Sequence, residues 1–166
     1  DGFYRNINKD TSTLHGTINN YAVLDYLPEL TDFTSSSGTY TFMVSELTHS
    51  PAFLQAPDYI PLAEVTDKGS SPLADNGFYH VNISALLLLG EWLDYLREQG
   101  AYQNTRIIIV GDHGEPVPTS VFPQEFVLPV RPEYFNPLLL VKDFNENGEL
   151  RTDLTFMTNA DVPFLS

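Results

Sequence analysis

In the stretch "RIIIVGDHGE", residues 106–115, a strand-forming run is followed directly by a polar turn. Residues 107–110 are an unbroken run of β-branched apolar side chains, which favours a buried β-strand. The run stops at residues 111–114, a Gly-Asp-His-Gly turn that contains Asp112 and His113. In open α/β sheets, functional groups collect just beyond the carboxyl ends of the strands. The sequence therefore places a carboxylate and an imidazole where α/β proteins bind ligands.

Two readings of this turn are open from residue chemistry. Asp112 offers hard oxygen atoms and His113 offers a borderline nitrogen, a mixture that suits Zn²⁺ or Mn²⁺, with Mg²⁺ and Ca²⁺ as alternatives. On this reading the two glycines let the backbone turn so that the two side chains converge on one point. On the other reading the segment is a tight turn, in which Asp112 caps backbone amides and His113 is exposed.

The segments around the turn predict an α/β sheet. The pattern over 78–98 predicts one long helix with Val81, Ala85, Leu88, Trp92 and Leu96 on one face, and Gly100 is a natural stop after it. "PLLLVKDF", 137–144, is a second continuous apolar strand, followed by a turn at 145–148. Continuous apolar strands next to a long helix indicate a sheet that is covered on both faces.

The remaining segments are less regular. Residues 1–20 are polar and predict a loop, and 19–33 has helical spacing that Pro28 can divide into two short pieces. The β-forming start of 40–50 predicts a strand that runs into a loop. Residues 51–77 contain several prolines and predict an irregular surface excursion, and 158–165 predicts a helix start capped by Asn159 or Thr158.

Composition limits the class of protein and its partners. The chain has 166 residues with 42% hydrophobic residues, which suits one domain with a substantial core. Its formal net charge is −14, so a nucleic acid or an acidic membrane surface would be repelled. It has no cysteine, which excludes thiolate zinc sites and a cysteine nucleophile. The longest apolar run, at 85–90, is too short to span a bilayer.

The segment 143–154 resembles a calcium-binding loop but lacks one of its required ligands. Residues 143–154 match the opening of such a loop, but Leu154 stands where the loop needs glutamate, and the segment follows a strand rather than a helix. A turn after the strand is the better reading.

The stretch "NTRIIIVGDHGE" resembles the Asp-His-Gly signature of the sulfatases and their relatives in the alkaline phosphatase superfamily, which include phosphoglycerol and phosphoethanolamine transferases. The preceding "LGEWLDYLREQGAYQNT" is similar to the helix before that signature. "FMVSELTHSPAF" resembles the strand and the His-x-Pro loop of the family. "NPLLLVKDF" and "MTNADVPFL" resemble its next strand and helix start. The matches cover about residues 40–165 in the family's order.

The resemblance implies a three-layer α/β/α sandwich with a mixed sheet, and a metal-dependent enzyme of sulfate or phosphate esters. Asp112 and His113 correspond to metal ligands of the family. His49 corresponds to the histidine that contacts the substrate anion or the leaving group; its alternative is a loop histidine that caps the turn before Pro51. We expect Glu115 at most to lie beside the metal ligands without binding the metal.

Four further residues lie outside this assignment. His80 is expected to be a packing or surface residue, and His15 lies outside the matched region. Asp161 is expected to bond backbone amides at a helix start. Arg131 can be read as a contact to an anionic ester or as part of a surface stretch.

The resemblance also implies that this chain is the C-terminal part of a catalytic domain. The family's nucleophile and its other metal ligands have no counterpart here, and a catalytic zinc takes at least three protein ligands. We expect the isolated chain to be inactive, in a parent enzyme that is membrane-anchored through other segments and works outside the cytoplasm. The alternative is a non-catalytic sulfatase-like binding or structural module.

Overall fold

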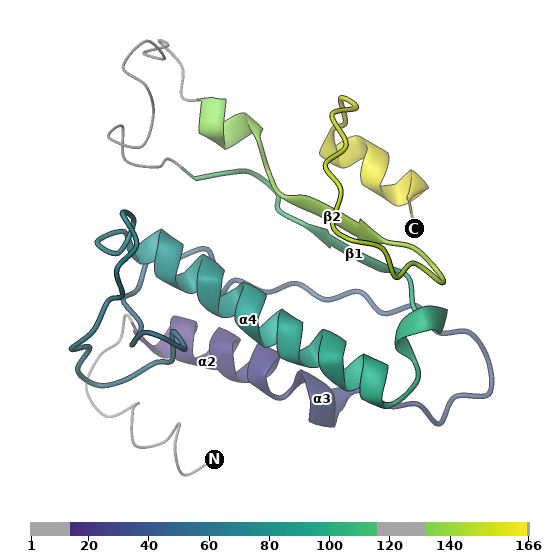
Figure 1. Ribbon diagram of the computed structural model, residues 1–166, viewed down its shortest axis with the longest axis horizontal. Coiled ribbons are helices and arrows are strands. Elements are labelled where there is room, and N and C mark those ends of the chain that lie inside the picture. The colour runs from purple at the N-terminus through teal and green to yellow at the C-terminus, as the bar shows by residue number, and fades with distance from the viewer. Residues whose placement is uncertain (1–13, 116–131, 166) are drawn as a thin grey trace. The chain divides into compact units, whose positions relative to one another are not determined.

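The computed structural model describes residues 14–115 and 132–165. Two compact units divide the chain, Asp1–Tyr95 and Leu96–Ser166, here called the N-terminal and the C-terminal unit. Helices make up the described regular structure of the first, and both described strands lie in the second (Figure 1). The protein therefore mixes α and β structure, as predicted. The single domain and the three-layer sandwich stay predictions.

The N-terminal unit begins with α2 (Leu14–Asp25) and α3 (Leu27–Leu30). Pro28 lies in the first turn of α3, where its missing N–H breaks no helical hydrogen bond, so the two-piece reading of 19–33 is confirmed. The predicted loop over 1–20 is wrong from Leu14 onward. Ile18 is fully buried, and burial of this kind stabilises a helix whose polar sequence alone predicts none.

Helix α4 (Gly77–Glu98) confirms the predicted long helix. Its apolar face packs on α2 within the N-terminal unit, and the two helices lie side by side in Figure 1. The shared core cluster contains Tyr21, Leu24, Leu47, Ala85 and Leu88. Among the helices of the described residues, none combines the length and the apolar character that crossing a bilayer requires.

The strand predicted at the start of 40–50 is wrong. Residues 40–46 form no strand, and Tyr40, Phe42 and Val44 are 78%, 77% and 72% exposed. Alternating β-formers make a strand only when a neighbouring strand forms hydrogen bonds with their backbone N–H and C=O groups. In the described residues, no strand pairs with 40–46. Leu47, just beyond them, is buried in the α2–α4 core and anchors the turn that follows.

His80 ties the irregular 51–77 excursion to α4. Its ring is fully buried, Nε2 lies 2.8 Å from the Ala74 carbonyl oxygen, and Nδ1 lies 3.0 Å from the Leu54 nitrogen. A carbonyl only accepts, so Nε2 donates to Ala74. In the neutral ring Nδ1 then accepts from the Leu54 N–H, and the Leu54 carbonyl oxygen also lies 3.0 Å from Nδ1. The expectation of a packing role for His80 is confirmed. A second core cluster forms around it, with Leu54, Ala56, Tyr59 and Val81.

The C-terminal unit begins with the last residues of α4, from Leu96. Gly100 has φ +69°, its N–H donates to the Arg97 carbonyl, and the Ala101 N–H donates to the Leu96 carbonyl. This pair of bonds is a Schellman motif, which a left-handed glycine permits. The chain then forms the 3₁₀ helix η1 (Tyr102–Asn104) and enters β1.

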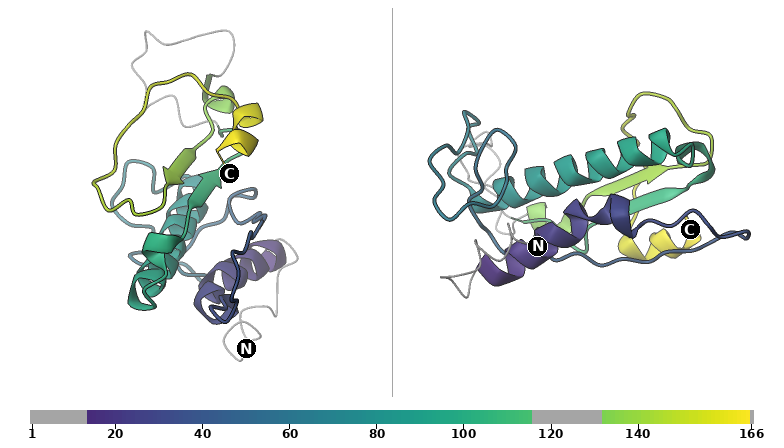
Figure 2. Two further views of the ribbon diagram at one scale, coloured as in Figure 1. Left: turned by 90° about the vertical axis from the view of Figure 1, so that its right-hand side faces the viewer. Right: turned by 90° about the horizontal axis from the view of Figure 1, so that it is seen from below.

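Strands β1 (Ile107–Val110) and β2 (Leu139–Lys142) form a two-stranded antiparallel sheet, visible from a second side in Figure 2. Ile107 is paired with Lys142 and Val110 with Leu139. Both strands lie within the predicted ranges. Val110 and Val141 are more than 40% exposed, and the covering of both faces of the sheet stays a prediction.

We expect His80→Leu to lower the free energy of unfolding by about 2–4 kcal/mol, because a leucine leaves the Leu54 N–H and the Ala74 carbonyl without a partner. The exposed His49→Leu is the matched control and should change it by no more than about 0.5 kcal/mol. Urea denaturation followed by Trp92 fluorescence measures both. Equal midpoints for the two variants would contradict the structural role of His80.

Candidate functional site

The Gly-Asp-His-Gly turn is fixed to the rest of the C-terminal unit through its backbone. The Gly111 N–H donates to the Leu138 carbonyl at 2.9 Å, which extends the β1–β2 ladder by one pair. The side-chain amide of Asn159 donates to the carbonyls of Gly111, at 3.3 Å, and Asp112, at 2.8 Å. Asn159 begins η5 (Asn159–Phe164), so this helix end holds the turn in place.

Gly114 is required by a close backbone approach. A Cβ atom at this position would lie 1.9 Å from the Glu133 carbonyl oxygen, in η4 (Pro132–Phe135). The Gly114 N–H donates to the neighbouring Tyr134 carbonyl at 3.3 Å. Neither Gly111 nor Gly114 has a positive φ, so the turn does not depend on the left-handed conformation that glycine favours. At Gly114 the reason is space for another segment's backbone.

The side chains of Asp112 and His113 do converge. His113 Nδ1 lies 2.9 Å from the Gly114 carbonyl oxygen, and since a carbonyl only accepts, Nδ1 carries the proton. The neutral ring then presents its lone pair at Nε2, which lies 3.7 Å from Asp112 Oδ2. The other carboxylate oxygen, Oδ1, accepts from the His113 N–H at 3.0 Å. A backbone bond to one ring nitrogen that frees the other is typical of metal-binding histidines.

The separation of these two atoms fits one metal ion. Zinc binds histidine nitrogen and carboxylate oxygen at roughly 2.0–2.2 Å, so two ligand atoms of one ion lie no more than about 4.3 Å apart. Nε2 and Oδ2 meet this limit. The side chains are 48% exposed for His113 and 89% for Asp112, which leaves the site open to solvent. In residues 14–115 and 132–165, no group of three or more such ligands occurs.

The surroundings of His113 favour its charged form. The hydrogen bond to the Gly114 carbonyl raises the pKa of His113 above its ordinary value, and the Asp112 carboxylate and then Glu115 add to this. The ring also lies near that of Tyr134, with 6.5 Å between centroids. Glu115 thus acts on the imidazole through its charge.

His49 belongs to the N-terminal unit, so its part in a common site with Asp112 and His113 stays a prediction. It is exposed in the turn after Leu47, its N–H donates to the Glu46 carbonyl, and Nδ1 lies 3.4 Å from Ser50 Oγ. Among the described residues, no hydrogen bond to His49 Nε2 is found.

Other sequence-based expectations have clear outcomes. Thr158 is the cap of η5, and Asp161 accepts hydrogen bonds from the Thr158 N–H and hydroxyl, which hold the pKa of Asp161 below its usual range. The contact of the Asn159 side chain with the turn was missed, although the Asn-x-Asp pattern marked the segment.

Arg131 and the side chain of His15 lie outside the described residues. The turn after β2 lies at 144–145, where the Glu146 N–H donates to the Asp143 carbonyl at 3.3 Å, so it overlaps the start of the predicted 145–148.

Comparison of the chain with family models, with curated proteins and with solved structures gives no match.

We expect Gly114→Ala to destabilise the C-terminal unit by about 1–3 kcal/mol, because the new Cβ overlaps the Glu133 carbonyl. Amide hydrogen exchange of β1 and β2 residues measures this local stability. Gly90→Ala in α4 is the matched control: nothing lies within 4 Å of its Cβ, and it should stabilise the helix by about 1 kcal/mol. Unchanged exchange in Gly114→Ala would contradict the close approach.

In the metal-free protein we expect an imidazole pKa for His113 above the ordinary value of about 6.5. Since the folded state binds the proton more tightly, this contribution to stability is fully present below the ordinary pKa and is lost as the pH rises through the folded pKa. An NMR titration of the four histidines measures it. Asp112→Asn should lower the value; a pKa at or below 6.5 in the wild type would disprove the arrangement.

Proposed function

We propose that this chain is part of a sulfatase-like, metal-dependent enzyme that hydrolyses or transfers sulfate or phosphate ester groups. The observation that carries the proposal is the pairing of Asp112 Oδ2 with His113 Nε2 at 3.7 Å, with Nδ1 held by the Gly114 carbonyl. The motif order over residues 40–165 supports it, because Asp112 and His113 occupy the ligand positions of the resemblance.

In this proposal Asp112 and His113 supply two ligands of a divalent metal, Zn²⁺ or Mn²⁺ by their mixed oxygen and nitrogen donors. A bound metal of this kind lowers the pKa of a nucleophile and neutralises charge on the transferred group. The protein's own contribution is orientation. The Gly114 carbonyl fixes the tautomer of His113, and the Asn159 amide fixes the backbone of Asp112.

His49 has the role of contacting the anionic ester or protonating the leaving oxygen. Its exposed ring is accessible to such a substrate. A third metal ligand and the nucleophile are to be supplied by chain outside the described residues or by the rest of a parent protein. The isolated chain is therefore expected to be inactive toward aryl sulfates and aryl phosphates.

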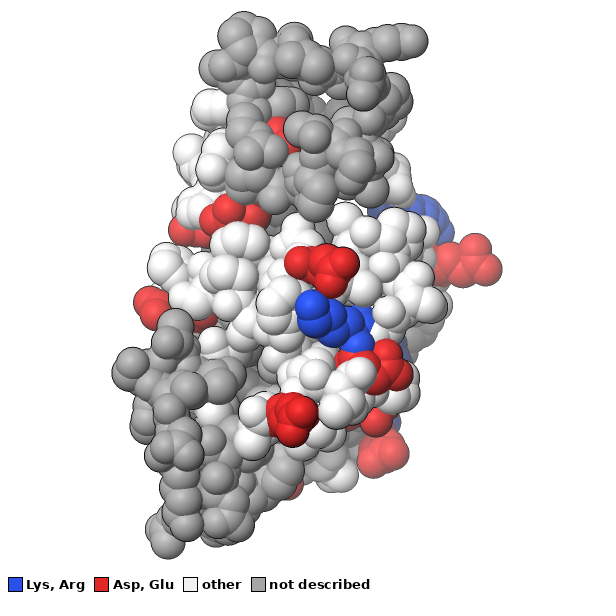
Figure 3. Space-filling view, turned by 90° about the vertical axis from the view of Figure 1, so that its left-hand side faces the viewer, with Lys and Arg blue, Asp and Glu red and all other residues white. Residues whose placement is uncertain are grey.

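The finer fold and the location belong to the same proposal. The antiparallel β1–β2 pair is compatible with a mixed sheet, and we assign it to an incomplete three-layer α/β/α sandwich. The parent is assigned to the outside of the cytoplasm and to a membrane anchor. Nucleic acid is not a partner, given the net charge of −14. On the face drawn in Figure 3, acidic side chains are scattered singly and the visible basic ones lie beside them.

Calorimetric titration with Zn²⁺ and with Mn²⁺ tests the metal site. We expect weak binding by the wild type, reduced at least about tenfold in Asp112→Ala/His113→Ala. His49→Ala is the matched control, because this histidine is assigned to the substrate and should leave the metal affinity unchanged.

Equal metal affinity of the wild type and the double variant would contradict the assignment of Asp112 and His113 as ligands. Absence of binding in the wild type, with Zn²⁺ and Mn²⁺ alike, would favour a plain turn in a non-catalytic module. Metal-dependent turnover that is lost in Asp112→Ala would show instead that this chain is sufficient for catalysis.

A further inference from the structure

Two asparagines of this chain are followed directly by glycine. They are Asn76, before Gly77, and Asn147, before Gly148, and each asparagine follows an acidic residue. In such a pair the backbone nitrogen of the glycine can attack the side-chain carbonyl carbon of the asparagine, because glycine has no Cβ that obstructs the approach. Asparagine counts among the thermolabile residues of proteins. The two local sequences are so alike that they predict similar rates of this reaction.

The N-terminal unit holds Asn76 in place just before α4. Its Oδ1 accepts from the Phe78 N–H at 2.9 Å, its own N–H donates to the Leu73 carbonyl at 2.8 Å, and its carbonyl accepts from the His80 N–H at 3.4 Å. A side-chain oxygen that binds an N–H of the first turn is the usual arrangement at the start of a helix. Closing a ring onto the Gly77 nitrogen would rotate this side chain and its backbone carbonyl, so these bonds would have to break first.

Gly77 is confined as well. A Cβ on it would lie 2.9 Å from Pro51 Cβ and 3.0 Å from the Ala52 nitrogen, so the backbone of this glycine packs closely against another segment. The Gly77 nitrogen therefore has little room to move toward the Asn76 side chain. The hydrogen bonds of Asn76 and the packing of Gly77 both oppose the reaction at this position.

Asn147 and Gly148 are exposed and lie just beyond the turn that follows β2. Among the described residues, no backbone hydrogen bond involves either of them. A Cβ on Gly148 would meet only the ends of two side chains, Arg151 Nη2 at 3.4 Å and Glu146 Oε2 at 3.9 Å. One is a cation and the other an anion, so their effects on the acidity of the Gly148 N–H oppose each other. The backbone of this pair can therefore rotate without breaking backbone hydrogen bonds.

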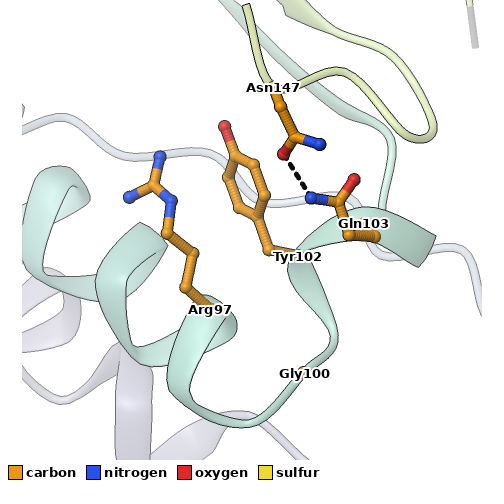
Figure 4. A pocket seen from close by; sticks show the side chains of 5 residues that line it. All are labelled: Arg97, Gly100, Tyr102, Gln103 and Asn147. Atoms are coloured by element: carbon orange, nitrogen blue, oxygen red, sulfur yellow. Dashed lines mark hydrogen bonds between the residues drawn. The ribbon is translucent and has the colours of Figure 1, made fainter.

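The side-chain amide of Asn147 is bound at its oxygen. Gln103 Nε2 donates to Asn147 Oδ1, and both residues line a small pocket at the end of α4 together with Arg97, Gly100 and Tyr102 (Figure 4). A donor on a carbonyl oxygen stabilises the negative charge that develops there when the carbon is attacked. Among the described residues, no hydrogen bond holds Asn147 Nδ2, the nitrogen that must leave. Asn147 is thus polarised for attack at its carbonyl carbon.

We propose that Asn147, and not Asn76, is a site of spontaneous deamidation in the folded protein. The Gly148 N–H loses its proton to hydroxide, and the nitrogen forms a bond to Asn147 Cγ. The Cγ–Nδ2 bond breaks, and Nδ2 leaves as ammonia with a proton taken from water. Water then opens the succinimide ring at one of its two carbonyls, which leaves aspartate or isoaspartate. The product adds a negative charge beside Gln103, and isoaspartate also lengthens the backbone by one methylene carbon.

The test is incubation of the whole chain at mildly alkaline pH, followed by digestion with a protease that works in mild acid, where deamidation is slow. Mass spectrometry with fragmentation measures the conversion of each asparagine from amide to acid. We expect Asn76 to react at least about tenfold more slowly than Asn147, because its hydrogen bond to the first turn of α4 must break first. The same incubation in urea should make the two rates similar, since the unfolded chain presents both pairs alike.

Gly148→Ala is the matched variant. Its Cβ meets only the flexible ends of Arg151 and Glu146, so the fold should be retained, while the methyl group should slow ring closure at Asn147 several-fold. Equal rates at Asn147 and Asn76 in the folded protein, or no conversion at Asn147, would overturn the proposal. A difference of the same size in urea would also overturn it, because the local sequence and not the fold would then set the rates. The wild-type rates decide the matter even if Gly148→Ala does not fold.

Discussion

The close passage of Gly114 by the Glu133 carbonyl is the constraint on which the candidate site depends. It lets η4 lie against the turn, so that the chain can enter β2 and pair with β1 beside it. The turn is then held in one conformation by its backbone, and the Gly114 carbonyl is available to His113 Nδ1. The free Nε2 beside the Asp112 carboxylate is therefore a consequence of backbone packing rather than of the two side chains themselves.

Polar contacts do much of the stabilising in the C-terminal unit. A two-stranded sheet is marginal in water when nothing else supports it. Here Lys142 binds the carbonyls of Tyr102 and Thr105, and Asn159 binds those of Gly111 and Asp112. These bonds connect the end of β2 to the start of β1, and η5 to the end of β1. The N-terminal unit is stabilised differently, by apolar clusters and by one fully buried histidine, His80.

The sequence could predict those parts whose pattern is local. The 3.6-residue period of α4, the left-handed stop at Gly100 and the β-branched run of β1 were all readable, because each depends on neighbours within a few residues. The strand expected from Tyr40 onward does not form. A strand needs hydrogen bonds from a second strand, and the local sequence does not show whether one lies beside it. The helix from Leu14 was missed for the same reason, because burial of Ile18 is decided by packing.

By itself, the sequence determined the strongly acidic character of the chain and the helix and strands that flank the Asp-His pair, and it named Asp112 and His113 as candidate metal ligands. Only the tertiary structure decided which nitrogen of His113 is free, why Gly114 must lack a Cβ, and that Asn159 secures the turn. It also decided that Arg97 and Lys142 share the ring of Tyr102. The physical reason is that each of these depends on carbonyl oxygens or rings brought together by pairing of segments far apart in the chain, and no local pattern records that pairing.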